Sequence, residues 1–419
     1  MGFPWGAILS QILAVFLQVL FYQPFFWIIV VLIWLQNRRL LNTREALFGV
    51  RGSVLYPVLT AIGYGILGGL IGSVLMVVLG ISLNDLGILW LWIIAILLML
   101  INPRFLCFSY AGGILALISL LTGYPKLNIP ALMGLVAVLH LIESVLILIS
   151  GHIDPLPVYV RNRFGRVVGA FNLQKFWPIP LVVVAMATVA QQGPTGDMIR
   201  MPDWWPLLRP LGVLSAQAAY GLLPVIAALG YGELAVTCLP RERVRRTSLH
   251  LTLFSLVLLC LAILAAYVPQ TVILVTLFAP LGHEVVIRVE QRSELQGQPR
   301  FVPPARGVMV LDALRGSPSQ QAGLRSGDVI LKIADIPVNS RAQLAYALDI
   351  SGPSVEIEYQ QEPGRLRRTR ITVDPNGPPD LIARYGVILA PEPNDPPTVD
   401  LSTTSPLQGI YRRLARARH

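Results

Sequence analysis

The chain has 419 residues, of which 54% are hydrophobic and 13% are charged, whereas about a quarter of a typical soluble domain is charged. The apolar residues are concentrated in 1–299 and the rest has an ordinary soluble composition. This excludes a single soluble domain and predicts a membrane part followed by a soluble part. The net charge of +10 does not indicate nucleic-acid binding, because the basic residues form short clusters between apolar runs, as membrane orientation requires.

Nine apolar runs are candidates for membrane-spanning helices, since a helix needs about 20 apolar residues to cross the hydrocarbon core. They are 5–36, 54–80, 87–101, 105–122, 130–150, 177–191, 211–238, 249–267 and 270–287. The first run contains Pro24, so it is either one kinked helix or an interfacial helix followed by a short span. The sixth run is short and begins with Trp177-Pro178-Ile179-Pro180, so an even number of spans stays open.

The basic residues indicate how the membrane part is oriented. With nine spans, the basic clusters after the first, fifth, seventh and ninth runs all lie on one side. They include Arg38, Arg39, Arg44, Arg51, Arg161, Arg163, Arg166, Lys175, Arg241, Arg243, Arg245, Arg246, Arg288 and Arg292. Because positive loops stay in the cytoplasm, the soluble part is predicted to be cytoplasmic and the N-terminus to lie outside.

Glycines crowd the second run. Gly65 and Gly69 form a GxxxG pair, and so do Gly68 and Gly72. Small residues let backbones approach closely in lipid, so this run predicts a tight helix contact, within the chain or between chains.

Two ionisable residues lie inside the fifth run. His140 and Glu143 are three residues apart and therefore share one helix face. Ionisable groups within a bilayer usually have a partner or a role, so a metal or proton site is one interpretation. A polar anchor between helices is the favoured one, because one histidine and one glutamate are too few ligands for zinc. Glu233 is a candidate neighbour.

No catalytic, metal or cofactor site is predicted. His283-Glu284 begins like the zinc-protease motif His-Glu-x-x-His, but Ile287 stands where the second histidine belongs. The cysteines Cys107, Cys238 and Cys260 lie in or beside apolar runs without a CxxC partner, so they are interpreted as small apolar membrane residues.

The soluble part alternates predicted strands with two helices. Ser317 and Pro318 open a short helix as N-cap and first residue, and Ser340 opens a second helix with Leu344, Ala347 and Leu348 on its apolar face. The predicted strands are 307–311, 329–333, 354–360 and 366–373, with a turn at 362–364 and a last strand at 384–389.

Three strings in this part are typical of one domain family. Gly-Ser-Pro at 316–318, Ala-Gly-Leu at 322–324 and Gly-Asp-Val-Ile at 327–330, in this order, resemble a PDZ domain of the bacterial, circularly permuted type. The resemblance implies a small, β-sandwich-like α/β fold that binds an extended peptide by adding it to a sheet edge.

By the same resemblance, the groove is predicted between the strand from Gly307 and the helix from Ser340. The expected groove residues are Arg306, Gly307, Val308, Met309, Val310, Leu344 and Leu348. Arg306 and Gly307 would lie near the loop that receives a terminal carboxylate. The alternative is that the groove binds nothing and the domain only packs on the membrane part.

The predicted organisation has three parts. Residues 1–290 form an α-helical polytopic membrane domain of about nine helices, and 300–390 form the cytoplasmic PDZ domain. Residues 391–419 are expected to be a flexible Pro-rich linker and a basic tail, which either contacts anionic lipid or is a plain solvated terminus.

The order of parts and several local strings resemble the MinJ-like topological determinants of cell division in some Gram-positive bacteria. The strings are Trp5-Gly6, Glu143-Ser144-Val145-Leu146-Ile147-Leu148, Gly165-Arg166-Val167-Val168-Gly169, Gln174-Lys175-Phe176-Trp177-Pro178-Ile179-Pro180 and Gly282-x-Glu284. The chain departs from the pattern in its Pro-rich extension after residue 390 and in its basic tail.

The resemblance implies a non-enzymatic membrane scaffold, enriched at poles and division septa. It would link a DivIVA-like polar scaffold to a MinD-like ATPase, contact membrane lipid and bind no nucleic acid. A homo-oligomer is an open alternative to a monomer. The alternatives are a PDZ-containing intramembrane protease, a regulator of a membrane protease, or a transporter.

Overall fold

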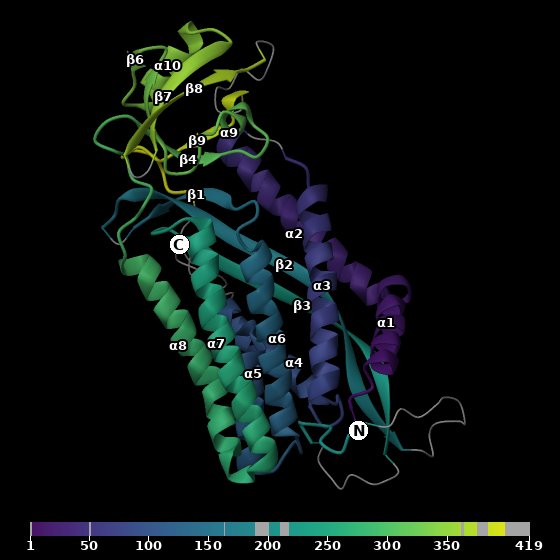
Figure 1. Ribbon diagram of the computed structural model, residues 1–419. Helices are drawn as coiled ribbons and strands as arrows, with labels where there is room; N and C mark the ends of the chain where they lie inside the picture. The colour runs from purple at the N-terminus through teal and green to yellow at the C-terminus, as the bar shows by residue number, and fades with distance from the viewer. Residues whose placement is uncertain are drawn as a thin grey trace, which may run out of the picture.

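The computed structural model describes residues 2–49, 52–162, 164–188, 201–209, 218–361, 364–374 and 384–398. Figure 1 shows a helical part crossed by a long two-stranded ribbon, with a smaller α/β domain at one end. The basic tail, the first two residues of the predicted turn at 362–364 and most of the loop before the seventh apolar run lie outside the described residues.

Eight α-helices form the described N-terminal part, and six of them are long and apolar enough to cross a membrane, counting the η3 turn with α8. They are α1 (Trp5–Tyr22), α2 (Pro24–Phe48), α3 (Leu55–Leu79), α4 (Ile88–Ile101), α5 (Phe108–Thr122), α6 (Ile129–Ser150), α7 (Pro240–Tyr267) and α8 (Val272–Gln296), with 3-10 turns η1 (Pro103–Leu106) and η3 (Pro269–Thr271). The first predicted run is two helices, because the extended backbone of Gln23 separates them and Pro24 opens α2.

Two predicted helical spans are wrong. The runs at 177–191 and 211–238 form strands, β2 (Val167–Thr188) and β3 (Ala218–Ala235), wherever the structure describes them. They pair antiparallel from Phe171 with Ala235 to Thr188 with Ala218, and β1 (Leu156–Arg161) pairs with the start of β2. Pro178, Pro180 and Pro224 disfavour helix, and the valines at 182–184 favour strand.

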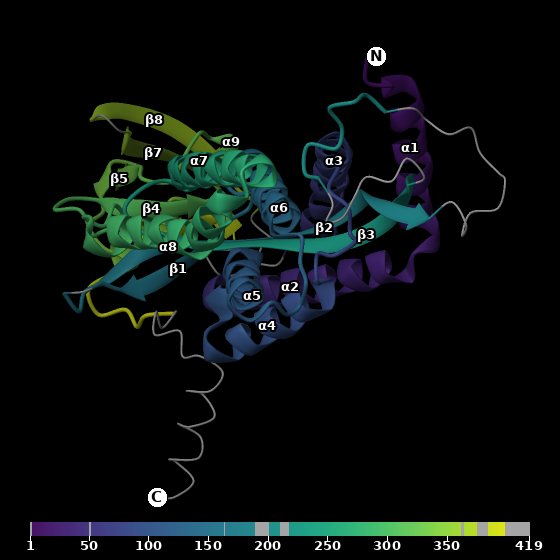
Figure 2. The same cartoon turned by 90° about the horizontal axis from the view of Figure 1, so that it is seen from below.

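The ribbon passes between α3 on one side and α1 and α2 on the other (Figure 2). A strand in an apolar setting must satisfy its main-chain groups, and the edge of β2 toward α3 exposes few donors. Pro178 and Pro180 carry no N–H there, and the next donor along that edge, Val182 N–H, bonds Ser73 Oγ at 2.9 Å. Val184 O accepts from Leu83 N–H at 3.0 Å.

The glycines of α3 provide the close contact that their spacing predicts, and the contact is within the chain. A Cβ at Gly65 would lie 2.2 Å from the carbonyl oxygen of Pro178, and one at Gly69 would lie 2.1 Å from that of Pro180. On the neighbouring face, Gly68 and Gly72 pack against Ile142 of α6. The partner of the GxxxG face is therefore a strand as well as a helix.

A buried ion cluster joins the end of β3 to α7 and α8. Arg243 pairs with Glu233 at 2.8 Å, with Glu290 at 2.5 Å and with Glu294 at 3.4 Å. Glu294 also accepts from the main-chain N–H groups of Val236 and Thr237, the first residues after β3. One guanidinium thus holds three elements together.

Helices α4 and α5 form a hairpin that is too short to cross a membrane. Fourteen residues of helix extend about 21 Å, against a hydrocarbon core of about 30 Å. The turn of the hairpin, η1 and Cys107, meets α6 at His140 and α8 at His283, near the middle of both longer helices.

The α/β domain has the predicted strands and helices. It contains β4 (Val308–Ala313), α9 (Pro318–Gln321), β5 (Val329–Ile333), β6 (Ile336–Pro337), α10 (Arg341–Ile350), β7 (Ser354–Gln361), β8 (Arg365–Thr372) and β9 (Val387–Leu389). The main sheet has the order β8-β7-β5-β4-β9. Ser317 and Ser340 cap α9 and α10 as predicted, each accepting from a main-chain N–H three residues on.

The domain shares a hydrophobic core with the helical part. Phe301, Leu311 and Ile388 belong to the same buried cluster as Phe171 of β2. Gly169 N–H donates to Phe301 O at 2.9 Å, and the missing side chain of Gly169 leaves room for Leu311 and Phe301. The domain is therefore docked on the base of the ribbon.

Candidate peptide-binding groove and intramembrane polar cluster

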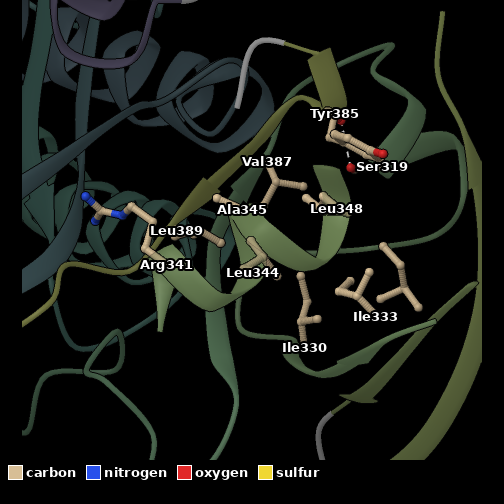
Figure 3. Close-up of a pocket in the computed structure, with 11 residues that line it drawn as sticks. Ser319, Ile330, Ile333, Arg341, Leu344, Ala345, Leu348, Tyr385, Val387 and Leu389 are labelled. Atoms are coloured by element: carbon tan, nitrogen blue, oxygen red, sulfur yellow. Dashed lines mark hydrogen bonds between the residues drawn. The ribbon is translucent and has the colours of Figure 1, made fainter. Parts of the chain in front are cut away.

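An apolar cavity of about 200 Å³ lies between α10 and β9. Figure 3 shows side chains from α10, β5 and β9 pointing into it. Its apolar lining includes Ile330, Ile333, Leu344, Ala345, Leu348, Ile357, Val387 and Leu389. A concave apolar site beside a sheet edge can hold an extended peptide with an apolar side chain.

The structure corrects the strand that borders this groove. Among the described residues, β4 pairs with β5 on one edge and with β9 on the other, so it has no free edge for a peptide. The edge strand next to α10 is β9. This arrangement could not be read from the sequence, because β9 lies more than 70 residues after β4 along the chain.

The predicted groove residues therefore divide into two sets. Leu344 and Leu348 line the cavity, whereas Val308 and Val310 pack in the core of the domain. Gly307 forms a turn with φ +85°, and its N–H donates to Asn339 Oδ1 at 2.9 Å. None of the residues 306–310 lines the cavity.

Tyr385, in the loop before β9, lines the cavity, whereas Arg306 and Gly307 do not. Gly386 has φ +68°, and a Cβ there would lie 2.2 Å from Ser317 Cβ, so the position requires glycine. Ser319 Oγ donates to Tyr385 O at 2.7 Å, and Leu314 N–H donates to Gly386 O at 2.9 Å. The signal for this loop in the sequence is the string Tyr385-Gly386-Val387 ahead of the last predicted strand.

A polar latch closes the far end of the groove. Tyr159 of β1 donates its hydroxyl hydrogen to Leu389 O at 2.8 Å, and Arg341 donates to the Tyr159 oxygen at 3.3 Å. The Arg341 guanidinium also pairs with Asp395 at 2.7 Å, and the main-chain N–H of Arg341 donates to Glu392 Oε1. Burial raises the pKa of Tyr159 to about 12, so its hydroxyl remains a donor at neutral pH.

The latch includes part of the chain that was expected to be a flexible linker. Thr398 exchanges hydrogen bonds with the main chain of Tyr159, and Glu392 and Asp395 bind Arg341. Residues 391–398 are thus fixed against β1 and α10, and 399–419 lie outside the described residues.

The two intramembrane residues singled out from the sequence have different surroundings. His140 is buried, and its Nε2 lies 3.0 Å from Cys107 Sγ. Glu143 makes no hydrogen bond or ion pair with any described residue, but it interacts electrostatically with His140 and with Glu233, its suggested neighbour, which itself pairs with Arg243.

Two further residues join His140 in a cluster that the sequence did not indicate. Cys107 and His283 lie 33 and 143 residues away along the chain, so no local spacing connects them. The neighbouring Glu284 pairs with Arg288 at 2.7 Å and with Arg104 at 3.4 Å, and it accepts from the Tyr110 hydroxyl. The His283-Glu284 step is therefore part of a larger polar site.

These features define a protein that joins apolar, membrane-type helices to a C-terminal PDZ domain. The PDZ domain family matches residues 309–360, which end before β8 and β9. The chain is similar to the cell division topological determinant MinJ of Bacillus subtilis, with 22% identity over 57% of each chain. The resemblance to MinJ-like proteins is thereby confirmed.

A second relative points to another functional class. A stretch of 88 residues is 28% identical to a putative serine protease, HhoA, of Synechocystis, and covers 21% of this chain and 22% of HhoA. The chain thus spans about 57% of the length of the first relative and about a fifth of the second.

Proposed function

We propose that the chain is a membrane adaptor whose PDZ domain binds an extended segment of a partner protein in the groove between α10 and β9. The observation that carries this proposal is the apolar cavity beside β9, the edge strand of the domain's sheet. Alternate residues of a strand point their main-chain groups to the same edge. At the two ends of β9, Gly386 O accepts from Leu314 N–H and Ala390 N–H donates to Met309 O, so the main-chain groups of Val387 and Leu389 point to the opposite edge, toward the groove.

The partner is proposed to end in, or to contain, an apolar side chain. Most side chains that line the groove are aliphatic, and the charged one among them, Arg341, is paired with Asp395 in the latch. The Tyr385-Gly386 loop lies where a terminal carboxylate enters a PDZ domain, and main-chain hydrogen bonds along β9 would hold the rest of the peptide.

The latch limits how far such a peptide can extend. The Tyr159 hydroxyl donates to the carbonyl oxygen of Leu389. A peptide that pairs with Leu389 must therefore displace this hydroxyl. A short peptide pairs with Val387 alone and leaves the latch closed.

The role proposed for the adaptor is placement of the division site. The similarity to MinJ supports it, and the partners would be a DivIVA-like polar scaffold and a MinD-like ATPase. The end of α2, the β1–β2 turn, the start of α7 and the end of α8, where the basic clusters lie, are at the end of the helical part that carries the PDZ domain (Figure 1), which supports a multi-pass protein with this domain in the cytoplasm. The proposed role would concentrate it at poles and septa.

The proposed domain organisation is a membrane part at 1–290, a PDZ domain at 300–390 and a C-terminal segment at 391–419, of which 391–398 packs on β1 and α10. The proposed adaptor contacts membrane lipid and has no catalytic role, and its self-association is an open alternative.

The test is localisation of a fluorescent fusion in dividing host cells with the groove blocked. Ala345 is half-buried in the lining of the cavity, so Ala345→Arg obstructs the groove without changing the core. Ala342 is exposed on the same helix, so Ala342→Arg is the matched control. We expect septal enrichment of the parent and the control, and uniform membrane fluorescence of Ala345→Arg.

Two outcomes contradict the proposal. Septal enrichment of all three proteins would show that the groove does not target the chain. Uniform fluorescence of all three would remove the division role and favour the second candidate, an intramembrane protease or a regulator of a membrane protease, which the similarity to HhoA supports.

A further inference from the structure

Three side chains converge at the turn of the α4–α5 hairpin. Cys107 is the N-cap of α5, His140 lies near the middle of α6, and His283 lies near the middle of α8. Cys107 Sγ is 3.0 Å from His140 Nε2 and 3.6 Å from His283 Nε2, and the ligand atoms of all three lie within 4.8 Å of one another.

The surroundings of His140 prepare one nitrogen for a ligand. Its Nδ1 lies 2.7 Å from the carbonyl oxygen of Val136, which can only accept, so Nδ1 carries the hydrogen. Nε2 therefore has a free electron pair that faces the sulfur. A histidine that binds a metal typically donates its other N–H to such a carbonyl.

His283 has an unsatisfied nitrogen. Only 9% of the residue is exposed, and among the described residues its Nδ1 has no hydrogen-bond partner and its Nε2 has only the long contact with sulfur. Rings of Tyr110 and Phe254 pack edge-on against it at 5.3 and 5.5 Å. A buried imidazole without good hydrogen bonds is costly, and a bond from one of its nitrogens to a metal would offset that cost.

We propose that Cys107, His140 and His283 bind one thiophilic d10 metal ion, Zn²⁺ or Cu⁺. One thiolate and two imidazoles form a ligand set that suits both ions. Cu⁺ and one thiolate make an uncharged unit, which fits the apolar setting. Zn²⁺ leaves a net positive charge and takes a fourth ligand.

The metal would fasten a helical hairpin that does not reach across the membrane. Its three ligands come from α5, α6 and α8, so the ion would tie the turn of the hairpin to both long helices. Without the metal, Cys107 and His140 form an ordinary hydrogen-bonded pair.

The first experiment measures the zinc and copper content of the purified full-length protein by elemental mass spectrometry. We expect about one zinc or one copper per chain, and which of the two is found identifies the ion. Cys107→Ser should lose the metal, whereas Cys260→Ser, at an exposed cysteine of α7, should keep it. Absence of both metals from the parent protein, or full retention in Cys107→Ser, would overturn the proposal.

A second experiment needs no variant that has to fold. The parent protein is stripped with a chelator and treated with iodoacetamide, with and without one equivalent of Zn²⁺ or of Cu⁺ under reducing conditions. Peptide mass spectrometry should show that the ion slows alkylation of Cys107 at least tenfold and leaves that of Cys260 unchanged. Equal alkylation of Cys107 with and without both ions would contradict the site.

Discussion

Two sheet edges lie beside helices in this molecule, and they are treated in opposite ways. The edge of β2 toward α3 is closed, because Pro178 and Pro180 remove donors and Ser73 satisfies Val182 N–H. The edge of β9 toward α10 borders an apolar cavity of about 200 Å³. A strand edge leaves room for a cavity only where the neighbouring helix stays at a distance, and glycines on α3 allow that helix to come close to β2.

The largest effect is expected at the end of the closed ribbon. Arg243→Met removes the cation shared by Glu233, Glu290 and Glu294 and leaves buried carboxylates unpaired, which costs about 3–5 kcal/mol of unfolding free energy. Thermal unfolding in detergent would measure the loss. Arg241→Met, at an exposed position of the same helix, is the control, and equal behaviour of the two variants would contradict the role of the cluster.

The second largest effect on stability is expected when the contact between α3 and β2 is forced apart. Gly69→Leu places a side chain where the carbonyl of Pro180 lies, and such overpacking costs about 1–3 kcal/mol or more. Gly63→Leu on the same helix has no neighbouring atom within 4 Å and should change the unfolding temperature little. If both variants unfold at the same temperature, stability does not depend on the close contact of α3 with β2 at Gly69.

Removing a single hydrogen bond from the closed edge tests how it is satisfied. Ser73→Ala leaves the buried Val182 N–H without its partner, which costs about 1–3 kcal/mol. Hydrogen exchange at the Val182 amide should speed up in the variant. An unchanged exchange rate would mean that another group satisfies this donor.

The open edge should respond in the opposite direction. Tyr159→Phe frees the carbonyl of Leu389, so a peptide that pairs with this residue no longer displaces a hydroxyl. A hydrogen bond contributes about 0.5–1.5 kcal/mol, so binding should tighten about two- to tenfold. Fluorescence anisotropy with an apolar C-terminal peptide selected on the protein would measure it, with Tyr346→Phe, at an exposed tyrosine of α10, as control. Weaker binding would show that Tyr159 supports the groove.

A further effect concerns pH at the base of the domain. Burial raises the pKa of Asp312 to about 6 from an ordinary value of 3.8, although Arg44 opposes the shift. The folded state then holds the proton more tightly than the unfolded chain, so stability is highest below about pH 4 and falls as pH rises to about 6. Asp312→Asn should flatten this dependence, for which a shift of this size sets an upper limit of about 3 kcal/mol.

The pH dependence would be read from unfolding temperatures between pH 4 and pH 7. Asp349→Asn, at an exposed position of α10, should leave the curve unchanged. A curve for Asp312→Asn that matches the parent would exclude this carboxyl as its source.

Local patterns predicted what depends on local physics. The N-caps Ser317 and Ser340, the strands of the PDZ domain and most apolar helices follow from residue types within one or two turns of each position. The ribbon was missed because an apolar run of 15 to 28 residues predicts a helix by length alone. The signal against a helix was the proline spacing at 178 and 180.

The sites depended on contacts between distant segments. Leu344 and Leu348 were found from the face of one helix, but β9 replaced the predicted strand because sheet order is a property of the whole domain. Cys107 and His283 reach His140 only after α5, α6 and α8 have packed, so spacing in the sequence could not indicate them.

The length of β2 has a mechanical consequence. Its 22 residues extend at most about 70 Å as one strand, from beneath the PDZ domain to the opposite end of the helical part. Phe171, near one end of this strand, supports the domain, and β1, which pairs with it there, carries the tyrosine that holds the latch. The same end of one strand therefore contacts both the core that supports the PDZ domain and the strand that carries the latch, so a displacement of this end would alter both.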